Sequence, residues 1–152
     1  MLKLTKKADY GLIAMKHLAE RALAAPSGDL RSTCCSAKDV ADSYGLPQEA
    51  LAKILQKLAK SGLLVSQFGT NGGYTLARDP RRITAFEVIQ AIEGPVLGTS
   101  CVSVRGKCEQ SSRCTVREPL RRVSQGIEDV LSRITIYEMA MDSSGAELVN
   151  IE

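Results

Sequence analysis

The chain has 152 residues, a length typical of one domain or of a small domain with an appendage. Hydrophobic residues make up 44% of it and aromatic residues only 4%, which predicts an aliphatic core. No apolar run approaches the ~18 residues of a membrane-spanning helix, and the amphipathic start lacks a signal-peptide core, so we expect a cytoplasmic protein with no membrane partner. The net charge of +3 is mildly basic, so where the positive charge lies matters more than its amount.

Apolar residues at helical spacing predict a mainly α-helical fold. The first helix is expected over residues 6–24 and ends before a loop that contains Pro26 and Gly28. A short second helix is expected over residues 37–44, with Ser36 as its N-cap and Gly45 at its end. Pro47 then suits the first position of a third helix, which reaches Lys60.

Two strand-like runs, residues 63–68 and 74–77, flank a glycine-rich segment. The segment contains an Asn71-Gly72 step, which is a strong signal for a β-hairpin. Thr84 and Glu87 form a capping box for a helix that ends at residue 93. A long helix over about 116–133 follows an irregular segment, and a last short helix is capped by Thr135 and Glu138.

A short helix, a tight turn, a second helix and a hairpin predict a winged helix-turn-helix, in which the second helix reads DNA. Leu51, Ile54, Leu55 and Leu58 give this helix its core face. Its other face carries lysines that suit phosphates and amides that suit base edges. A solvated helix is the alternative, but the following Gly-rich hairpin favours DNA binding. The predicted contacts to double-stranded operator DNA are Gln48, Glu49, Lys53, Gln56, Lys57, Lys60, Asn71, Gly72 and Arg78.

The long helix near the C-terminus has an apolar stripe at spacings of three and four. Because paired half-sites are the usual target of small readers, this helix is expected to join two copies into a homodimer. The alternative is that it packs on its own domain. The stripe consists of Leu120, Val123, Ile127, Val130, Leu131 and Ile134.

Five cysteines in a chain expected to be cytoplasmic argue against a disulfide framework. Cys101, Cys108 and Cys114 lie in one irregular segment with the spacing C-x6-C-x5-C, and such long loops are usually functional. Three thiolates can bind zinc or an iron–sulfur cluster, and the wide spacing argues against a zinc finger. Three unrelated thiols, or thiols that sense redox state, are the alternatives. Cys34 and Cys35 are adjacent and are expected to be solvent-facing thiols.

Several motifs together resemble the winged-helix regulator family that includes IscR and NsrR. They are the block Asp9-Tyr10-Gly11-Leu12, the wing Gly72-Gly73-Tyr74-Thr75-Leu76-Ala77-Arg78, the segment Glu93-Gly94-Pro95, and the three loop cysteines. Within this family the chain is most similar to the regulator of the SUF iron–sulfur assembly operon, on its first residues and on Cys114-Thr115-Val116-Arg117.

The resemblance implies a homodimer with an iron–sulfur cluster near its interface, which controls genes of iron–sulfur assembly. Cys101, Cys108 and Cys114 match the family's ligand cysteines. Some members place a histidine three residues after the last cysteine, where this chain has Arg117. Others use an aspartate from the start of the first helix, so the resemblance favours Asp9 of the partner subunit as fourth ligand. The cluster type, 2Fe-2S or 4Fe-4S, stays open.

These inferences divide the chain into a DNA-binding domain (1–94), a cluster-binding loop (95–114), a dimerisation helix with a short C-terminal helix (115–141) and a flexible tail (142–152). We expect no enzyme and no small-molecule substrate. The chain has a single histidine, His17, and no C-x-x-C motif, which leaves a thiol oxidoreductase with little support.

Overall fold

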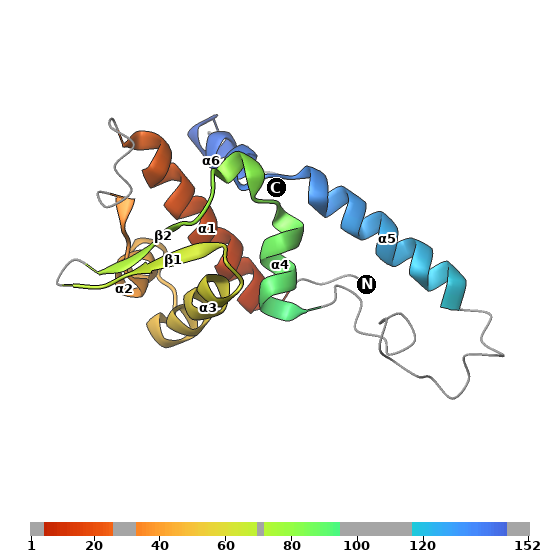
Figure 1. Ribbon diagram of the computed structural model, residues 1–152, viewed down its shortest axis with the longest axis horizontal. Coiled ribbons are helices and arrows are strands. Elements are labelled where there is room, and N and C mark those ends of the chain that lie inside the picture. Colours follow the sequence, from red (N-terminus) through yellow and green to blue (C-terminus); the bar gives the residue numbers. More distant parts are fainter. Residues whose placement is uncertain (1–4, 26–32, 70–71, 95–116, 146–152) are drawn as a thin grey trace, which may run out of the picture.

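The computed structural model describes residues 5–25, 33–69, 72–94 and 117–145 (Figure 1). It confirms the mainly helical winged-helix architecture, with a two-stranded antiparallel sheet. The elements are α1 (Lys6–Ala24), α2 (Ala37–Tyr44), α3 (Gln48–Lys60), β1 (Leu64–Gln67), β2 (Gly73–Leu76), the short 3-10 turn η2 (Pro80–Arg82), α4 (Ala85–Glu93), α5 (Arg117–Arg133) and α6 (Ile136–Gly145). Among the described helices, none is long and apolar enough to span a bilayer.

Helix α1 lies at the centre of the fold and contacts α3, α4 and α6. Thr5 caps its start, because the hydroxyl oxygen accepts a hydrogen bond from the Ala8 amide at 3.3 Å. Small residues on its buried face let the neighbouring helices come close. Gly11 is the tightest of these positions, since a Cβ there would lie 2.0 Å from Cδ1 of Ile92 on α4.

Residues at the ends of α2 determine where this first helix of the helix-turn-helix begins and ends. Ser36 and Asp39 form a complete capping box at the start of α2. Gly45 ends that helix in the left-handed region, with φ of 66°, where a side chain is disfavoured. His17 on α1 holds the far end of α2 through a 3.2 Å hydrogen bond between its Nδ1 and the Tyr44 hydroxyl. Burial lowers the pKa of His17, which favours the neutral form of its imidazole in this contact.

The hairpin pairs Leu64 with Leu76 and Gln67 with Gly73. Leu64, Thr75 and Leu76 face the core, whereas Val65 is exposed. In the turn of the hairpin, the amide of Gly72 donates a hydrogen bond to the Gly69 carbonyl oxygen at 3.0 Å. A Cβ at Gly72 would lie 2.8 Å from the Gln67 carbonyl oxygen, so this turn needs glycine.

The last helix, α6, returns to the core of the DNA-binding unit instead of staying with α5. Ile136 is fully buried and Ala140 nearly so, within the same cluster as the core of α1 and α3. Two backbone hydrogen bonds fix this return, from Ala85 to Ile134 at 2.8 Å and from Ile136 to Ile83 at 2.9 Å.

Helix α6 also continues to Gly145, into the segment 142–152 that we expected to be a flexible tail. The segment 142–145 contains no proline, and Asp and Ser are only modestly unfavourable in a helix, so nothing there stops the helix. Residues 146–152 lie outside the described part.

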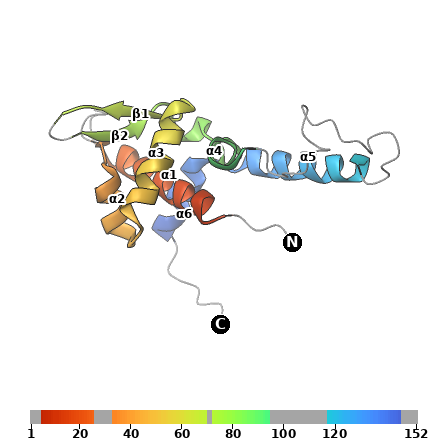
Figure 2. The same ribbon diagram turned by 90° about the horizontal axis from the view of Figure 1, so that it is seen from below.

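Helix α5 projects away from the other helices (Figures 1 and 2). Its apolar stripe is only partly buried by the described part of its own chain, which α5 contacts through α4. Val123 is 53% exposed and Val130 is 57% exposed, while Leu120, Ile127 and Leu131 are half-buried. An isolated apolar stripe of this kind is typical of a helix that packs against another chain.

Candidate nucleic-acid interface

Helix α3 has the two faces that its sequence predicts. Leu51, Ile54, Leu55 and Leu58 are each at most 3% exposed and anchor the helix in the core. The opposite face is open to solvent along the whole helix. It carries all six predicted DNA-contacting residues of α3, which are Gln48, Glu49, Lys53, Gln56, Lys57 and Lys60.

One of these side chains, Lys57, also makes a contact inside the molecule. Its Nζ donates to the carbonyl oxygen of Ile92, at the C-terminal end of α4, at 3.4 Å. A positive charge is favourable at that position because the free carbonyls of a helix end carry partial negative charge. Lys57 therefore links the predicted reading helix to the last turn of α4.

The hairpin lies beside α3 and ends in an exposed aromatic residue. Phe68 follows β1 directly and is 96% exposed, which is unusual for a large apolar side chain. The sequence predicts a strand over residues 63–68, so Phe68 was expected within it and not among the DNA contacts. Its position next to the Gly-rich turn was the available signal. Asn71 lies outside the described residues, so its contact with DNA stays a prediction.

The loop before α2 joins the hairpin as a partial third strand. Cys35 and Tyr74 exchange two backbone hydrogen bonds, of 3.1 and 2.8 Å. Cys35 is only 1% exposed, so the expectation of a solvent-facing thiol is wrong for this residue, and Cys34 is half-buried. Burial raises the pKa of both thiols, which lowers the fraction of reactive thiolate.

Gly73 makes this junction possible. A Cβ at Gly73 would lie 2.4 Å from the carbonyl oxygen of Cys35 and 2.7 Å from the amide nitrogen of Ser36, both of which are backbone atoms. We expect Gly73→Ala to separate the hairpin from this loop and to lower the free energy of unfolding by about 1–3 kcal/mol. Thermal unfolding measures the effect.

The matched control is Gly126→Ala in α5, where an added Cβ meets no atom within 4 Å. Removing a helical glycine there should stabilise the fold by about 0.5–1 kcal/mol. A Gly73→Ala protein that melts at or above the wild-type temperature would show that the junction tolerates a side chain.

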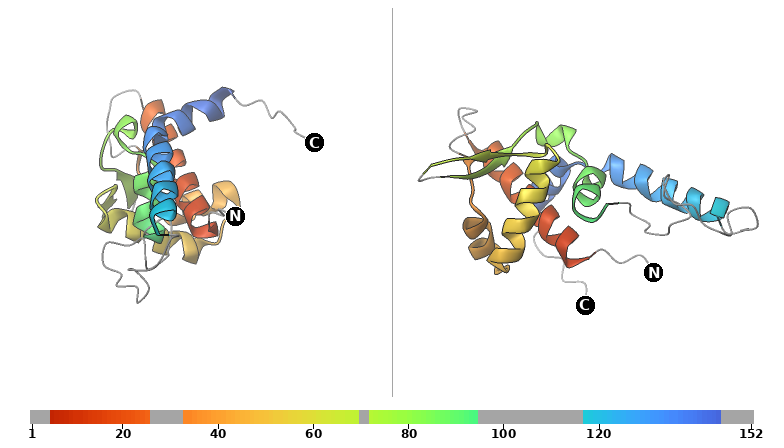
Figure 3. Two further views of the ribbon diagram at one scale, coloured as in Figure 1. Left: turned by 90° about the vertical axis from the view of Figure 1, so that its right-hand side faces the viewer. Right: turned by 60° about the horizontal axis from the view of Figure 1, so that its bottom comes forward.

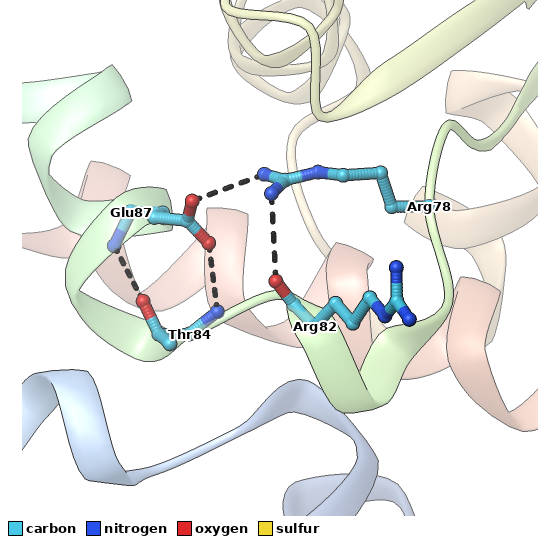
Figure 4. Close-up of polar contacts among 4 residues, drawn as sticks. All are labelled: Arg78, Arg82, Thr84 and Glu87. Carbon is cyan, nitrogen blue, oxygen red and sulfur yellow. Dashed lines mark hydrogen bonds and ion pairs between the residues drawn. The ribbon is translucent and has the colours of Figure 1, made fainter.

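Arg78 at the base of the hairpin is held by α4 (Figure 4). Its guanidinium lies 3.1 Å from Oε1 of Glu87, and it also donates to the carbonyl oxygen of Arg82 at 3.5 Å. The other carboxylate oxygen of Glu87 accepts from the Thr84 amide in the capping box. Arg78 thus braces the wing against α4, and its predicted contact with DNA stays a prediction.

Cys101, Cys108 and Cys114 lie outside the described residues, so the cysteine loop stays a prediction. Of the predicted ligands, only Asp9 is described. It is exposed in the first turn of α1, and within the described part of the chain its carboxylate has no hydrogen bond or ion pair. A free carboxylate together with three thiolates is a donor set that suits an iron–sulfur cluster.

The end of α4, which precedes the cysteine segment, is tied to two other helices. The hydroxyl of Thr5, at the start of α1, donates to a carboxylate oxygen of Glu93. The start of α1, where Asp9 lies, and the end of α4 are therefore neighbours within one chain. Lys57 adds the connection from this point to α3.

Comparison with known proteins places these features in a family context. The profile of the Rrf2 family, described as an iron-dependent transcriptional regulator, matches residues 4–142. The HTH-type transcriptional regulator IscR of Vibrio campbellii is 31% identical over 147 residues, which cover 97% of this chain and 82% of that protein. The structure of T. potens IscR is 31% identical, with a TM-score of 0.71 over 98% of this chain and 93% of that one.

A second solved structure is similar to a comparable degree. CymR, the global cysteine regulator of B. subtilis, is 30% identical, with a TM-score of 0.69 over 93% of this chain and 98% of that one. The predicted family is thereby confirmed, and its named members are transcriptional regulators and not enzymes.

Proposed function

Because this chain belongs to the Rrf2 family of iron-dependent transcriptional regulators, we propose that it binds operator DNA as a cytoplasmic homodimer and senses iron–sulfur cluster status. The observation that carries the proposal is the exposed face of α3, where lysines and amides lie beside the two-stranded hairpin. Such a face is suited to the phosphates and base edges of a DNA major groove.

DNA reading is assigned to α3 and the hairpin. The core face of α3 fixes the helix on the domain, so its other face can enter a major groove without rearrangement. Gln48 and Gln56 present amides, which can pair with an adenine edge. The Gly-rich end of the hairpin and Phe68 approach the adjoining minor groove, where apolar side chains can insert between base pairs.

The apolar stripe of α5 supports the homodimer. It stays partly exposed along a helix that projects beyond its contact with α4, so a second copy of α5 is a suitable partner. Two readers joined in this way bind two half-sites, with a large gain in affinity over one reader.

Cys101, Cys108 and Cys114, with Asp9 of the partner subunit, would hold the cluster. When bound, the cluster supplies a link between subunits that depends on iron supply and on redox state. Within the chain, Glu93 and Ile92 connect the end of α4, which precedes the cysteine segment in sequence, to α1 and α3. A cluster-dependent shift of the end of α4 would therefore act on the reading helix through the contact between Lys57 and Ile92. Regulation of SUF-type iron–sulfur assembly genes is the function proposed for this switch.

Selection from a random DNA library tests the proposal. The dimer should select a sequence with two related half-sites, since dimer symmetry is repeated in the operator. On the selected duplex, Gln56→Ala should lower affinity by about tenfold through lost base contacts, with little effect on a scrambled duplex. Fluorescence anisotropy measures both affinities.

The control truncates an exposed glutamine on a different helix. Gln90 is exposed on α4, so Gln90→Ala should leave both affinities unchanged. If the wild-type protein selects no sequence, DNA reading is excluded. If Gln56→Ala and Gln90→Ala behave alike, α3 does not read bases through Gln56.

A further inference from the structure

A groove runs along α3 on the side away from the hairpin. It has a volume of about 400 Å³ and lies where α3 meets the start of α1 and the end of α4. Figure 3 (right) shows these two helix ends on one side of α3 and the hairpin on the other. The rim and floor include Lys7, Glu49, Lys53, Ile54, Lys57 and Ile92.

The rim of this groove carries more positive than negative charge. Three lysines face one glutamate, and they come from two separate helices. Within the described residues, the ammonium groups of Lys7 and Lys53 make no hydrogen bond or ion pair, whereas that of Lys57 donates to the Ile92 carbonyl at 3.4 Å. Two free ammonium groups around an apolar floor leave an anion as the ligand with complementary charge.

Because the groove lies along the predicted reading helix α3, DNA is the most direct source of such an anion. A major groove is about 12 Å wide and has a phosphate backbone on each side. The hairpin lies on one side of α3, and the ends of α1 and α4 lie on the other (Figure 3). When α3 occupies a DNA major groove, these two sides would each face one of the two phosphate backbones.

We propose that this groove receives a backbone phosphate of the operator, and that Lys7 holds α3 in register from the side opposite the hairpin. The inference rests on the proposed DNA-binding function and adds a residue outside the helix-turn-helix. It also assigns a role to Lys53 in phosphate binding rather than base reading. Phosphate contacts of this kind fix orientation and carry no sequence information themselves.

The test compares two neighbouring lysines. Lys6 is exposed on the same turn of α1 but does not line the groove, so Lys6→Gln removes the same charge from the neighbouring position. Lys7→Gln should raise Kd about 3- to 10-fold for the selected operator and for a scrambled duplex alike, and should reduce the salt slope by about 1. Lys6→Gln should change Kd less than about twofold, through screened long-range charge alone.

Each alternative result has a distinct meaning. Equal effects of the two substitutions, or an unchanged salt slope in Lys7→Gln, would overturn the assignment and leave general electrostatic attraction. If wild type binds both duplexes but Lys7→Gln is silent, only this inference fails. If wild type binds neither duplex, the proposed function fails.

A free phosphate is the other source with the same chemistry. Titration of inorganic phosphate into the DNA-free protein, followed by NMR shifts of groove residues, separates the two sources. We expect no saturation at millimolar phosphate. Saturable binding that Lys7→Gln abolishes would overturn the DNA assignment and identify a pocket for a small phosphorylated ligand.

Discussion

The double substitution Val123→Asp with Val130→Asp is expected to convert the dimer to a monomer and to lower operator affinity by at least about 100-fold. Both side chains are more than half exposed on the stripe of α5. In a dimer they would become buried, and an unpaired carboxylate is costly to bury. Analytical ultracentrifugation measures the oligomeric state, and anisotropy measures the affinity.

The control adds the same charge to the outer face of the same helix. Gln125 and Ser132 are exposed away from the apolar stripe, so Gln125→Glu with Ser132→Asp should leave the dimer intact. A Val123→Asp, Val130→Asp protein that still sediments as a dimer would place the subunit contact elsewhere. A monomeric wild type would exclude the paired-reader mechanism.

Substitution of a cysteine in the predicted cluster-binding loop should change the iron and sulfide content of the protein. Cys108→Ala is expected to remove nearly all iron and sulfide from anaerobically purified protein, because a cluster with three cysteine ligands loses one of its strong donors. Iron and sulfide analysis, with the visible absorption spectrum, measures the loss. The same analysis distinguishes a cluster from zinc, which would give a colourless metal-bound protein.

Cys34→Ala is the matched control, since Cys34 lies in the loop before α2 and not among the predicted ligands. It should keep the iron and sulfide of the wild type. Retention of a full cluster by Cys108→Ala would contradict the ligand assignment. A wild type without iron and sulfide, even after reconstitution, would leave a DNA-binding regulator whose loop cysteines have another role.

Local sequence signals predicted the helices and the faces of α3 well. The capping residues Ser36 and Thr84 fixed the starts of α2 and α4, and the i, i+3, i+4, i+7 pattern identified the buried side of α3. These features depend on residues within one or two helical turns, so they can be recognised without knowing the tertiary structure.

Contacts between distant segments could not be predicted in the same way. The pairing of Cys35 with Tyr74 and the groove contact of Lys57 with Ile92 each join residues far apart in sequence. The return of α6 to the core is of the same kind, because Ile136 looks equally suited to a dimer helix. Such contacts follow from the packing of the whole domain, on which single-sequence patterns carry little information.

Operator affinity with and without the cluster tests most directly whether cluster status controls DNA binding. Anaerobic anisotropy on the selected duplex should compare cluster-loaded wild type with Cys108→Ala. The two affinities should differ by about 5- to 150-fold, the usual range for coupling between two sites. Equal affinities, with a cluster demonstrated in wild type and absent from the variant, would contradict the switch while leaving the DNA-reading surface of α3 in place.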